Sequence, residues 1–191
     1  MTAYTCNNNL KLPDPSLYQL GDTMTDRFGA KFILTTIGWT QNSETIPVQS
    51  AVAVLCPADT TEDILVSIPL QALSGNGSLC LYTQWSFTNN ANVKTLRVRL
   101  GGIAGAQYGM LAAASNVGAS IITNISNRGV QNSQVGYSMG VFDSGVSHGT
   151  GKVVSSVDMS VAGQTLLITA QKATAGDVIT LENYQLEWLP A

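Results

Sequence analysis

Charged side chains are scarce in this sequence. They make up 11% of its 191 residues, and nine basic against twelve acidic residues give a net charge of −3. An ordinary soluble domain carries roughly 25% charged residues. A nucleic-acid-binding protein needs a basic face, so we expect no direct nucleic-acid partner. So much neutral polar surface favours contact with other protein surfaces, whose central parts are poor in charge.

The basic residues form only one cluster, at Lys94, Arg97 and Arg99. In a β-strand, side chains two positions apart lie on the same face. Arg97 and Arg99 therefore share a face, which could meet an acidic partner. An ordinary solvated strand face is the preferred interpretation.

Cysteine and histidine are equally sparse. The three cysteines, Cys6, Cys56 and Cys80, are odd in number and contain no C-x-x-C pair, so neither a disulfide framework nor a zinc site is indicated. They are typical of free thiols in a reducing compartment. The one histidine, His148, follows Ser147 in a glycine-rich turn, where a catalytic base would lack an orienting partner. We expect no metal and no cofactor.

The sequence has no apolar run near the ~20 residues that a membrane span needs. Its N-terminus also lacks the basic flank and apolar stretch of a signal peptide. We therefore expect no membrane association, and we expect synthesis in the cytoplasm.

A pair of carboxylates suited to glycoside hydrolysis is also missing. Glu182 and Glu187 lie on one predicted strand but an odd number of residues apart, so the period of two places them on opposite faces. The sequence therefore predicts a protein that is not an enzyme.

What is present is a series of short apolar runs separated by Gly, Asn and Ser clusters. In the run SLCLYTQWSFT, Leu79, Leu81, Trp85 and Phe87 share one face, which is typical of a half-buried strand. Strands of this kind are predicted at 63–70, 78–88, 93–100, 119–126, 133–142, 152–161, 164–171 and 177–189. The segment 104–115 is broken by Gly and small residues, and a short helix at 110–114 is its only candidate element.

About eight antiparallel strands without a long helix favour an all-β sandwich, and eight is the strand number of a jelly roll. An immunoglobulin-like sandwich stays open on this evidence. We predict two regions: residues 1–58 and a jelly-roll domain at 59–191.

The N-terminal region is expected to begin with an extended arm over residues 1–20, whose geometry is restricted by Pro13 and Pro15. A β-hairpin is predicted to turn at Asp26 to Gly29, and a further strand at 51–56.

The predicted strand 177–189 is apolar on both faces. Leu186 and Trp188 fall on one face, and Ile179, Leu181 and Leu189 on the other. A strand of this kind is covered on both sides, and another subunit is a candidate cover. We therefore predict a subunit contact at Tyr184, Leu186 and Trp188.

Several motifs resemble a recurrent jelly-roll module of tailed-bacteriophage virion proteins. The stretch SIPLQALSGNGSLCLYTQWSFTNNANVKTLRVRLGG is similar to one part of it, and the segment Ile125 to Gly129 with Gln131 or Gln134 to another. The end of the chain, QTLLITAQKATAGDVITLENYQLEWLP, resembles the closing strands of that module. The likeness extends over about residues 59–190. The opening GDTMTDRFGAKFIL also resembles the first hairpin of some head-decorating proteins.

This resemblance implies a phage virion protein, most specifically a homotrimeric capsid cement or decoration protein on the outside of the head. Its partner would be the major capsid protein. The predicted attachment residues are Leu12, Pro13, Pro15, Leu17, Phe28 and Phe32. The alternative is a tail fibre or spike that recognises host polysaccharide, with Trp39 and Tyr side chains stacking on sugar rings.

Overall fold

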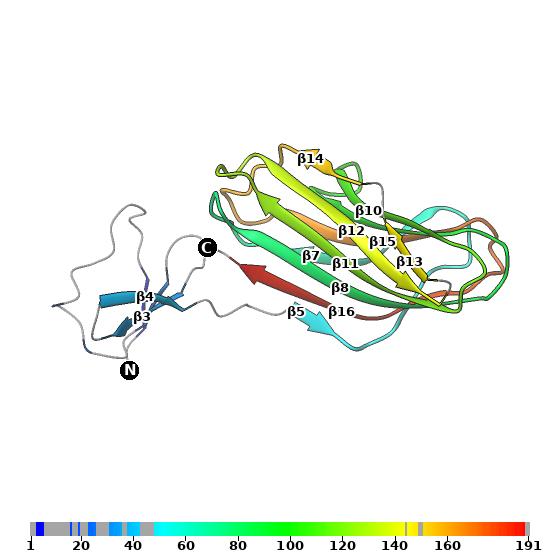
Figure 1. Ribbon diagram of the computed structural model, residues 1–191, viewed down its shortest axis with the longest axis horizontal. Coiled ribbons are helices and arrows are strands. Elements are labelled where there is room, and N and C mark those ends of the chain that lie inside the picture. The colour runs from blue at the N-terminus through cyan, green and yellow to red at the C-terminus, as the bar shows by residue number, and fades with distance from the viewer. Residues whose placement is uncertain are drawn as a thin grey trace.

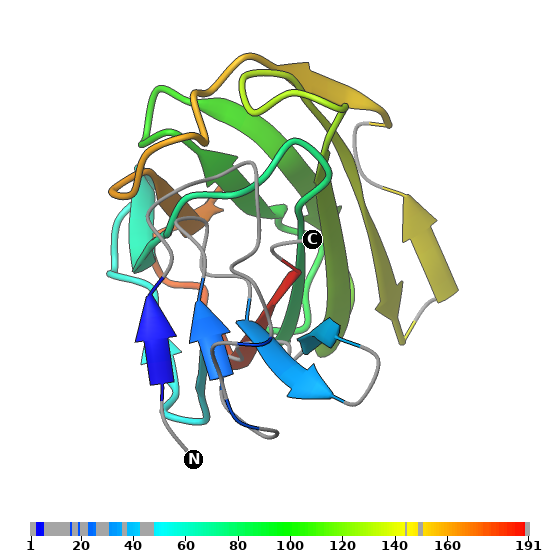
Figure 2. The ribbon, with the colours of Figure 1, turned by 90° about the vertical axis from the view of Figure 1, so that its left-hand side faces the viewer.

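A small four-stranded sheet opens the chain in the computed structural model. The structure describes residues 3–5, 16, 19, 23–25, 31–35, 38–42, 48–143, 145–148 and 151–189. The first sheet has the order β1-β2-β3-β4. Its strands are β1 (Ala3–Thr5), β2 (Thr23–Thr25), β3 (Lys31–Thr35) and β4 (Gly38–Asn42). Figure 2 shows this sheet in front of one end of the larger body.

The predicted hairpin is confirmed, since β2 and β3 pair antiparallel with Thr23 opposite Ile33. The predicted arm is only partly right, because β1 forms a parallel pair with β2 near the start of the chain.

The larger body is a sandwich of two sheets, and each strand pair within it is antiparallel. The smaller sheet has the order β10-β9-β15-β7. Its strands are β7 (Glu62–Pro69), β9 (Lys94–Leu100), β10 (Ala106–Ala113) and β15 (Thr165–Lys172).

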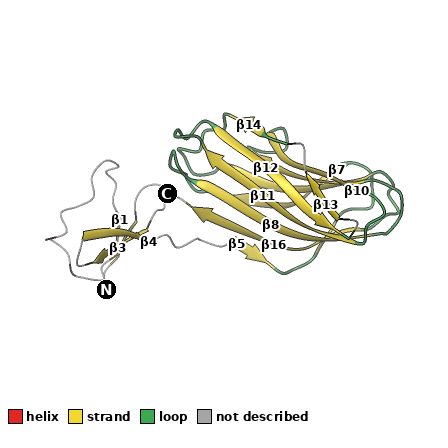
Figure 3. Cartoon of the chain, viewed as in Figure 1, coloured by secondary structure: helices red, strands yellow, loops and turns green. Residues whose placement is uncertain are grey.

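The larger sheet has eight strands in the order β13-β12-β11-β8-β16-β5, with β14 beside β12 and β6 beside β16. The strands are β5 (Val48–Ser50), β6 (Val54–Leu55), β8 (Ser78–Phe87), β11 (Gly118–Asn127), β12 (Gln134–Phe142), β13 (Gly145–His148), β14 (Val153–Ser155) and β16 (Ile179–Leu189). Figure 1 shows the long strands of this sheet side by side. Figure 3 shows strands and loops, without a helix, in the described part of the chain.

The predicted fold class, an all-β antiparallel jelly-roll sandwich, is confirmed. Strict alternation builds it: the burial of β9 changes at every residue, with Leu96, Val98 and Leu100 inside. Both sheets contribute large apolar side chains to one continuous core, including Leu81, Trp85 and Ile168. Burial of this apolar area is the main force that holds the two sheets together.

The sandwich differs from the prediction in three places. Residues 106–113, where only a short helix was considered, form strand β10, which pairs along β9. The predicted strand 152–161 ends at Ser155, and the following residues form a loop that buries Met159 and bonds its backbone to Leu73 and Gln131. The sandwich also gains β13. Together with β10, this makes ten strands in the described part of the chain after Asp59, where about eight were expected.

The sandwich sheet begins before Asp59, the boundary expected from the sequence. Strand β5 pairs with β16 through Gln49 and Gln185, and β6 pairs with it through Leu55 and Thr180. Residues 48–55 are therefore edge strands of the large sheet.

Candidate functional site

The outer face of the large sheet carries the candidate site. Strands β8, β11 and β12 contain no Asp, Glu, Lys or Arg. Solvated sheet faces are usually rich in polar and charged residues, so three adjacent uncharged strands mark this face as unusual. Two features lie on it: a groove built by strands that are far apart in the chain, and an apolar patch on β12.

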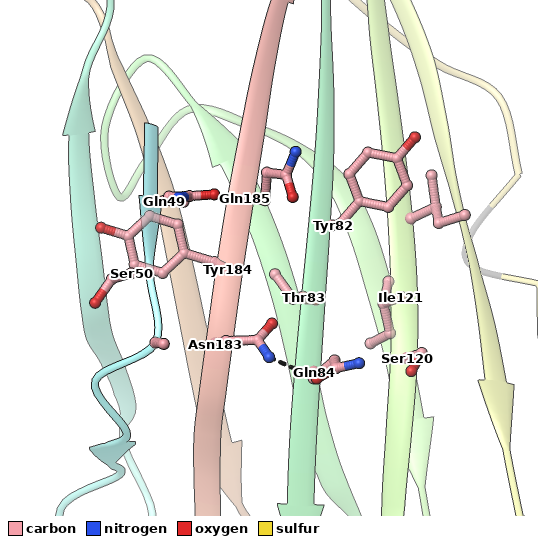
Figure 4. Close-up of a pocket in the computed structure, with 12 residues that line it drawn as sticks. Gln49, Ser50, Tyr82, Thr83, Gln84, Ser120, Ile121, Asn183, Tyr184 and Gln185 are labelled. Atoms are coloured by element: carbon pink, nitrogen blue, oxygen red, sulfur yellow. Dashed lines mark hydrogen bonds between the residues drawn. The ribbon is translucent and has the colours of Figure 1, made fainter. Parts of the chain in front are cut away.

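The first feature is a shallow groove of about 660 Å³ across β5, β16, β8 and β11. We call it the amide groove and define it by Gln49, Tyr82, Gln84, Ser120, Asn183 and Gln185, which line it. Figure 4 shows Asn183, Gln84 and Ser120 side by side, with the ring of Tyr82 at one side.

Strand register explains why these side chains meet. Gln185 lies opposite Tyr82 on one side and opposite Gln49 on the other, which makes one row across the sheet. Gln84 lies opposite Asn183 and Ser120, which makes the next row. Neighbouring strands lie about 4.8 Å apart, and rows two residues apart lie about 6.7 Å from each other. The side chains that define the groove thus cover an area of roughly 14 Å by 7 Å.

Local hydrogen bonds hold part of the groove in place. Asn183 Nδ2 donates to Gln84 Oε1 at 2.5 Å, and Gln185 Nε2 donates to Glu187 Oε1 at 3.2 Å. Among the side chains that define the groove, none is charged. A hydrogen bond with Cys80 raises the pKa of Tyr82 to about 12. Like any tyrosine hydroxyl, that of Tyr82 is protonated and can donate at neutral pH.

The second feature is an apolar patch on β12, defined by Tyr137, Met139 and Val141. Their exposed fractions are 54%, 37% and 54%. They alternate with buried residues on the same strand and extend toward Ile122, which lies opposite Met139. Contiguous exposed apolar side chains of this kind mark interaction surfaces.

A β-bulge in β16 changes the interpretation of the last strand. The register with β8 shifts between Leu181 and Asn183, so that Glu182 is an extra residue. A bulge places two residues opposite one, and so reverses which positions point inward. The apolar residues on both sides of the bulge, Ile179, Leu181, Leu186 and Trp188, consequently all lie in the core.

The predicted subunit contact is corrected by this bulge. Leu186 and Trp188 are buried within their own chain at 0% and 4% exposure, so their side chains pack the core and are not available to a neighbour. Tyr184 is half-buried, packs partly against the core and lines the groove near Ser50. The two-sided apolar pattern thus comes from a change of phase within the strand, and it needs no cover from a second subunit.

The bulge also corrects the expected placement of the two glutamates. Glu182 accepts a hydrogen bond from Ser86, and Glu187 lies opposite Cys80. Ser86 and Cys80 both belong to the outer face, so the two carboxylates share that face. Their backbone positions are roughly 15 Å apart at about 3.3 Å per residue, and Ser86 draws Glu182 away from Glu187. The carboxyl groups of glycosidases lie about 5–9.5 Å apart, so this pair does not have that arrangement.

Most predicted attachment residues lie outside the described part of the chain, namely Leu12, Pro13, Pro15, Leu17 and Phe28. Phe32 lies on β3 with a half-buried side chain. Trp39 belongs to β4 and His148 to β13.

The basic cluster is neither solvated nor open to an acidic partner. Arg99 donates to both carboxylate oxygens of Glu62, at 2.7 and 2.8 Å. Thr169 donates to Glu62 as well, and Arg97 donates to Gln171 at 2.8 Å. The Arg99 hydrogen bonds hold the pKa of Glu62 below its ordinary value. The outer face of the small sheet therefore pairs its charges within the chain, although Arg97 Nη1, 3.6 Å from Glu62 Oε2, makes no hydrogen bond.

Lys94 is fully buried at the end of the small sheet. Its Nζ donates to Asn90 Oδ1 at 2.5 Å and to the Asn92 carbonyl at 2.8 Å, and lies 3.7 Å from the Asp177 carboxylate. The hydrogen bond from Asn90 keeps the pKa of Asp177 low. A buried charge needs such partners, so this cluster has a structural role.

Asn127 and Gln134, which belong to the motif that resembles the phage module, also stabilise the fold through hydrogen bonds. Gln134 Nε2 donates to Asn127 Oδ1 at 3.0 Å, and Gln134 Oε1 accepts from Ser155 and from the Val157 backbone. Asn127 in turn donates to the Ser74 carbonyl at 2.6 Å. These bonds join β11, β12 and two loops at one end of the sandwich.

The described residues contain no group of three or more His, Cys, Asp or Glu side chains that could hold a metal ion. In the same part of the chain, no helix is long and apolar enough to span a membrane.

No protein-family model matches the sequence, and no curated protein matches it. Among solved structures, basic winged bean lectin is similar over 78% of this chain and 100% of the lectin, with a TM-score of 0.44 and 8% identity. The VP2 particle protein of infectious bursal disease virus is similar over 91% of this chain and 40% of VP2, with a TM-score of 0.39 and 10% identity. The CBM2 module of the evolved Dit of Lactobacillus casei BL23 phage J-1 is similar over 65% of this chain and 69% of the module, with a TM-score of 0.31 and 16% identity. None of these likenesses says anything of the ligands or partners of this chain.

Sequence reasoning missed the amide groove and the apolar patch. The groove depends on the order β11-β8-β16-β5 and on the bulge at Glu182. The patch had a signal that could have found it. In QVGYSMGVF the larger side chains Tyr137, Met139 and Val141 alternate with Gly136, Ser138 and Gly140, and the face with the larger side chains is the exposed one.

Proposed function

We propose that this chain is a structural protein of a phage virion, a trimer that decorates the outside of the head by binding the major capsid protein. The observation that supports it best is the uncharged outer face of the adjacent strands β8, β11 and β12, with the apolar patch on β12 at one side of it. A protein that stays in one assembly can keep such a face, because its neighbours cover it. The resemblance of the sequence to virion jelly-roll modules points the same way.

In this proposal the subunit contact uses the apolar patch. Tyr137, Met139 and Val141 are exposed and have no charged neighbour on β11 or β8. Aromatic residues and Met are enriched at the centres of protein interfaces. The proposed role is not catalytic, because the two glutamates of the outer face are too far apart to act together on one glycosidic bond.

The subunit contact is tested by Val141→Asp, with Val161→Asp as a matched control because both residues are 54% exposed. Burial of a charge at an interface opposes association. Light scattering at micromolar concentration is expected to show trimers for the wild type and the control, and monomers for Val141→Asp. A monomeric wild type would contradict the proposed trimer.

Head attachment is tested separately. A version that starts at Ile46 keeps β5 and β6 in the large sheet and removes the small first sheet. It is expected to fold and to lose affinity for undecorated heads, because the first sheet is proposed to make the capsid contacts. If this version decorates heads as tightly as the full chain, attachment belongs to the sandwich.

A second candidate is a receptor-binding part of a tail fibre or spike that recognises host polysaccharide. The amide groove favours it, since amide side chains beside an exposed aromatic ring suit sugars. Immunogold labelling of virions separates the two candidates. Label over the head supports decoration, and label at the tail tip supports adhesion.

A further inference from the structure

The amide groove is a preformed polar site with a definite chemistry. The six side chains that define it are four amides, one serine hydroxyl and one tyrosine. Each amide offers both a carbonyl acceptor and an NH₂ donor. Sugar hydroxyls likewise donate and accept at once, so a row of amides can bond adjacent hydroxyls of one ring in both directions.

The pairing within the groove leaves suitable groups available. The hydrogen bond between Asn183 and Gln84 uses Asn183 Nδ2 and Gln84 Oε1. The other polar atom of each amide, Gln84 Nε2 and Asn183 Oδ1, has no hydrogen-bond partner among the described residues. Ser120 lies next to Gln84 in the same row. A donor, an acceptor and a hydroxyl thus lie at spacings of about 4.8 Å, the distance between strands.

Tyr82 supplies the apolar part of the site. It is 38% exposed and lies opposite both Gln185 and Ile122. An aromatic ring can pack against the C–H face of a pyranose while its hydroxyl makes a hydrogen bond. Holding an aromatic ring and amides on rigid strands also reduces the entropy lost on binding.

Charge defines which sugars fit. No cation lines the groove, and the charged side chains of β16 beside it are Glu182 and Glu187. Recognition of a carboxylate, sulfate or phosphate would require Arg or Lys. The surroundings therefore disfavour sialylated, sulfated or phosphorylated glycans.

From these observations we infer that the amide groove binds a neutral oligosaccharide, with Tyr82 packing on a sugar ring and Gln84, Asn183 and Gln185 bonding its hydroxyls. This inference deepens the second candidate function and rests on it for its ligand class. Binding of a neutral oligosaccharide by the groove is compatible with a position on the head and with one at the tail tip.

The probe is a glycan array that contains neutral hexose and N-acetylhexosamine oligosaccharides together with their sialylated and sulfated forms. Full-length wild-type protein is expected to retain one or more neutral glycans and to bind the charged forms at least tenfold more weakly. Titration calorimetry then uses the neutral glycan with the strongest signal.

Single variants locate the site. Tyr82→Ala and Gln84→Ala are each expected to weaken binding at least tenfold, while Tyr82→Phe keeps most of it because the ring remains. Asn132→Ala, which removes an exposed amide in a loop outside the groove, is expected to bind as the wild type does. Equal melting temperatures of all variants establish that the fold is intact.

Three results would overturn the inference: no neutral glycan retained, binding of charged glycans alone, or undiminished binding by Tyr82→Ala and Gln84→Ala. None of these results changes the light-scattering or head-decoration experiments, so a failed groove and a failed virion assignment are distinguishable. Label at the head together with neutral-glycan binding would support a decoration protein that also holds a sugar.

Discussion

The outer faces of the two sheets differ in how their polar side chains are bonded. On the small sheet, Glu62, Arg97, Arg99 and Thr169 bond to one another or to Gln171 across three strands. On the large sheet, three strands have no charge, and the amides of the groove and the apolar patch on β12 are open to solvent. One face is satisfied within the chain and the other has capacity left for a partner.

This difference separates stability from function within one sandwich. Changes on the closed face should affect folding, because each removes a partner from a half-buried charge. Changes on the open face should affect binding and leave folding nearly unaltered, as expected for exposed positions. The predictions below compare matched positions from the core, the closed face and the open face.

The largest effect is expected from Leu186→Ala in β16. Leu186 is fully buried between the sheets, and removal of such a side chain costs about 2–5 kcal/mol. Its neighbour Gln185 points to the open face, so Gln185→Ala should change stability by less than about 0.5 kcal/mol. Urea unfolding measures both. A small effect of Leu186→Ala would contradict the inward phase that the bulge gives this strand.

The next effect is expected from Glu62→Gln on the closed face. The variant keeps the shape of the side chain but leaves Arg99 without its carboxylate. We expect a loss of about 1.5–3 kcal/mol, the range for hydrogen bonds to charged groups. Glu187→Gln on the open face is the matched control, with an expected change within about 0.5 kcal/mol. Equal losses for the two variants would remove the distinction between the faces.

A pH series sharpens the same comparison. The pKa of Glu62 lies below its ordinary value of 4.5 in the folded chain, chiefly because of its hydrogen bonds with Arg99. Its contribution is therefore fully present above about pH 4.5 and is lost as the pH falls toward the folded-state pKa. The stability gap between wild type and Glu62→Gln should be widest at pH 7 and narrow by pH 3. A gap that stays constant would show that the ion pair contributes nothing.

Much of the sandwich could be predicted from the sequence, because alternation records which face is buried. The runs at 78–88 and 93–100 correspond closely to β8 and β9. Strand β10 could not be predicted, since its small residues give a weak pattern and its register shifts between Gln107 and Gly109. The prediction of which residues of β16 point inward was wrong for a related reason. One extra residue at Glu182 shifts the alternation by one position.

The candidate site was less predictable than the fold. Its rows join Gln49, Gln84, Ser120 and Gln185, which are far apart in the sequence and meet only through strand order. Alternation places each of these residues outward but does not reveal its neighbours. The scarcity of charge was visible from the start, although only the structure concentrates it on one face.

The smallest effect on stability is expected from labelling of Cys80, which reports directly on the open face. Cys80 is half-buried on β8 near Tyr82, whereas Cys56 is buried and burial raises its pKa to about 11. In a Cys6→Ser background, a thiol reagent at pH 7.5 should therefore modify Cys80 first, because the thiolate is the reactive form and access is required. Mass spectrometry of proteolytic fragments gives the order of modification.

Labelled protein should melt within a few degrees of unlabelled protein. A neutral glycan in the groove should slow the labelling of Cys80 while leaving the labelling of Cys56 unaffected. Faster modification of Cys56 would contradict the contrast between the core and the open face.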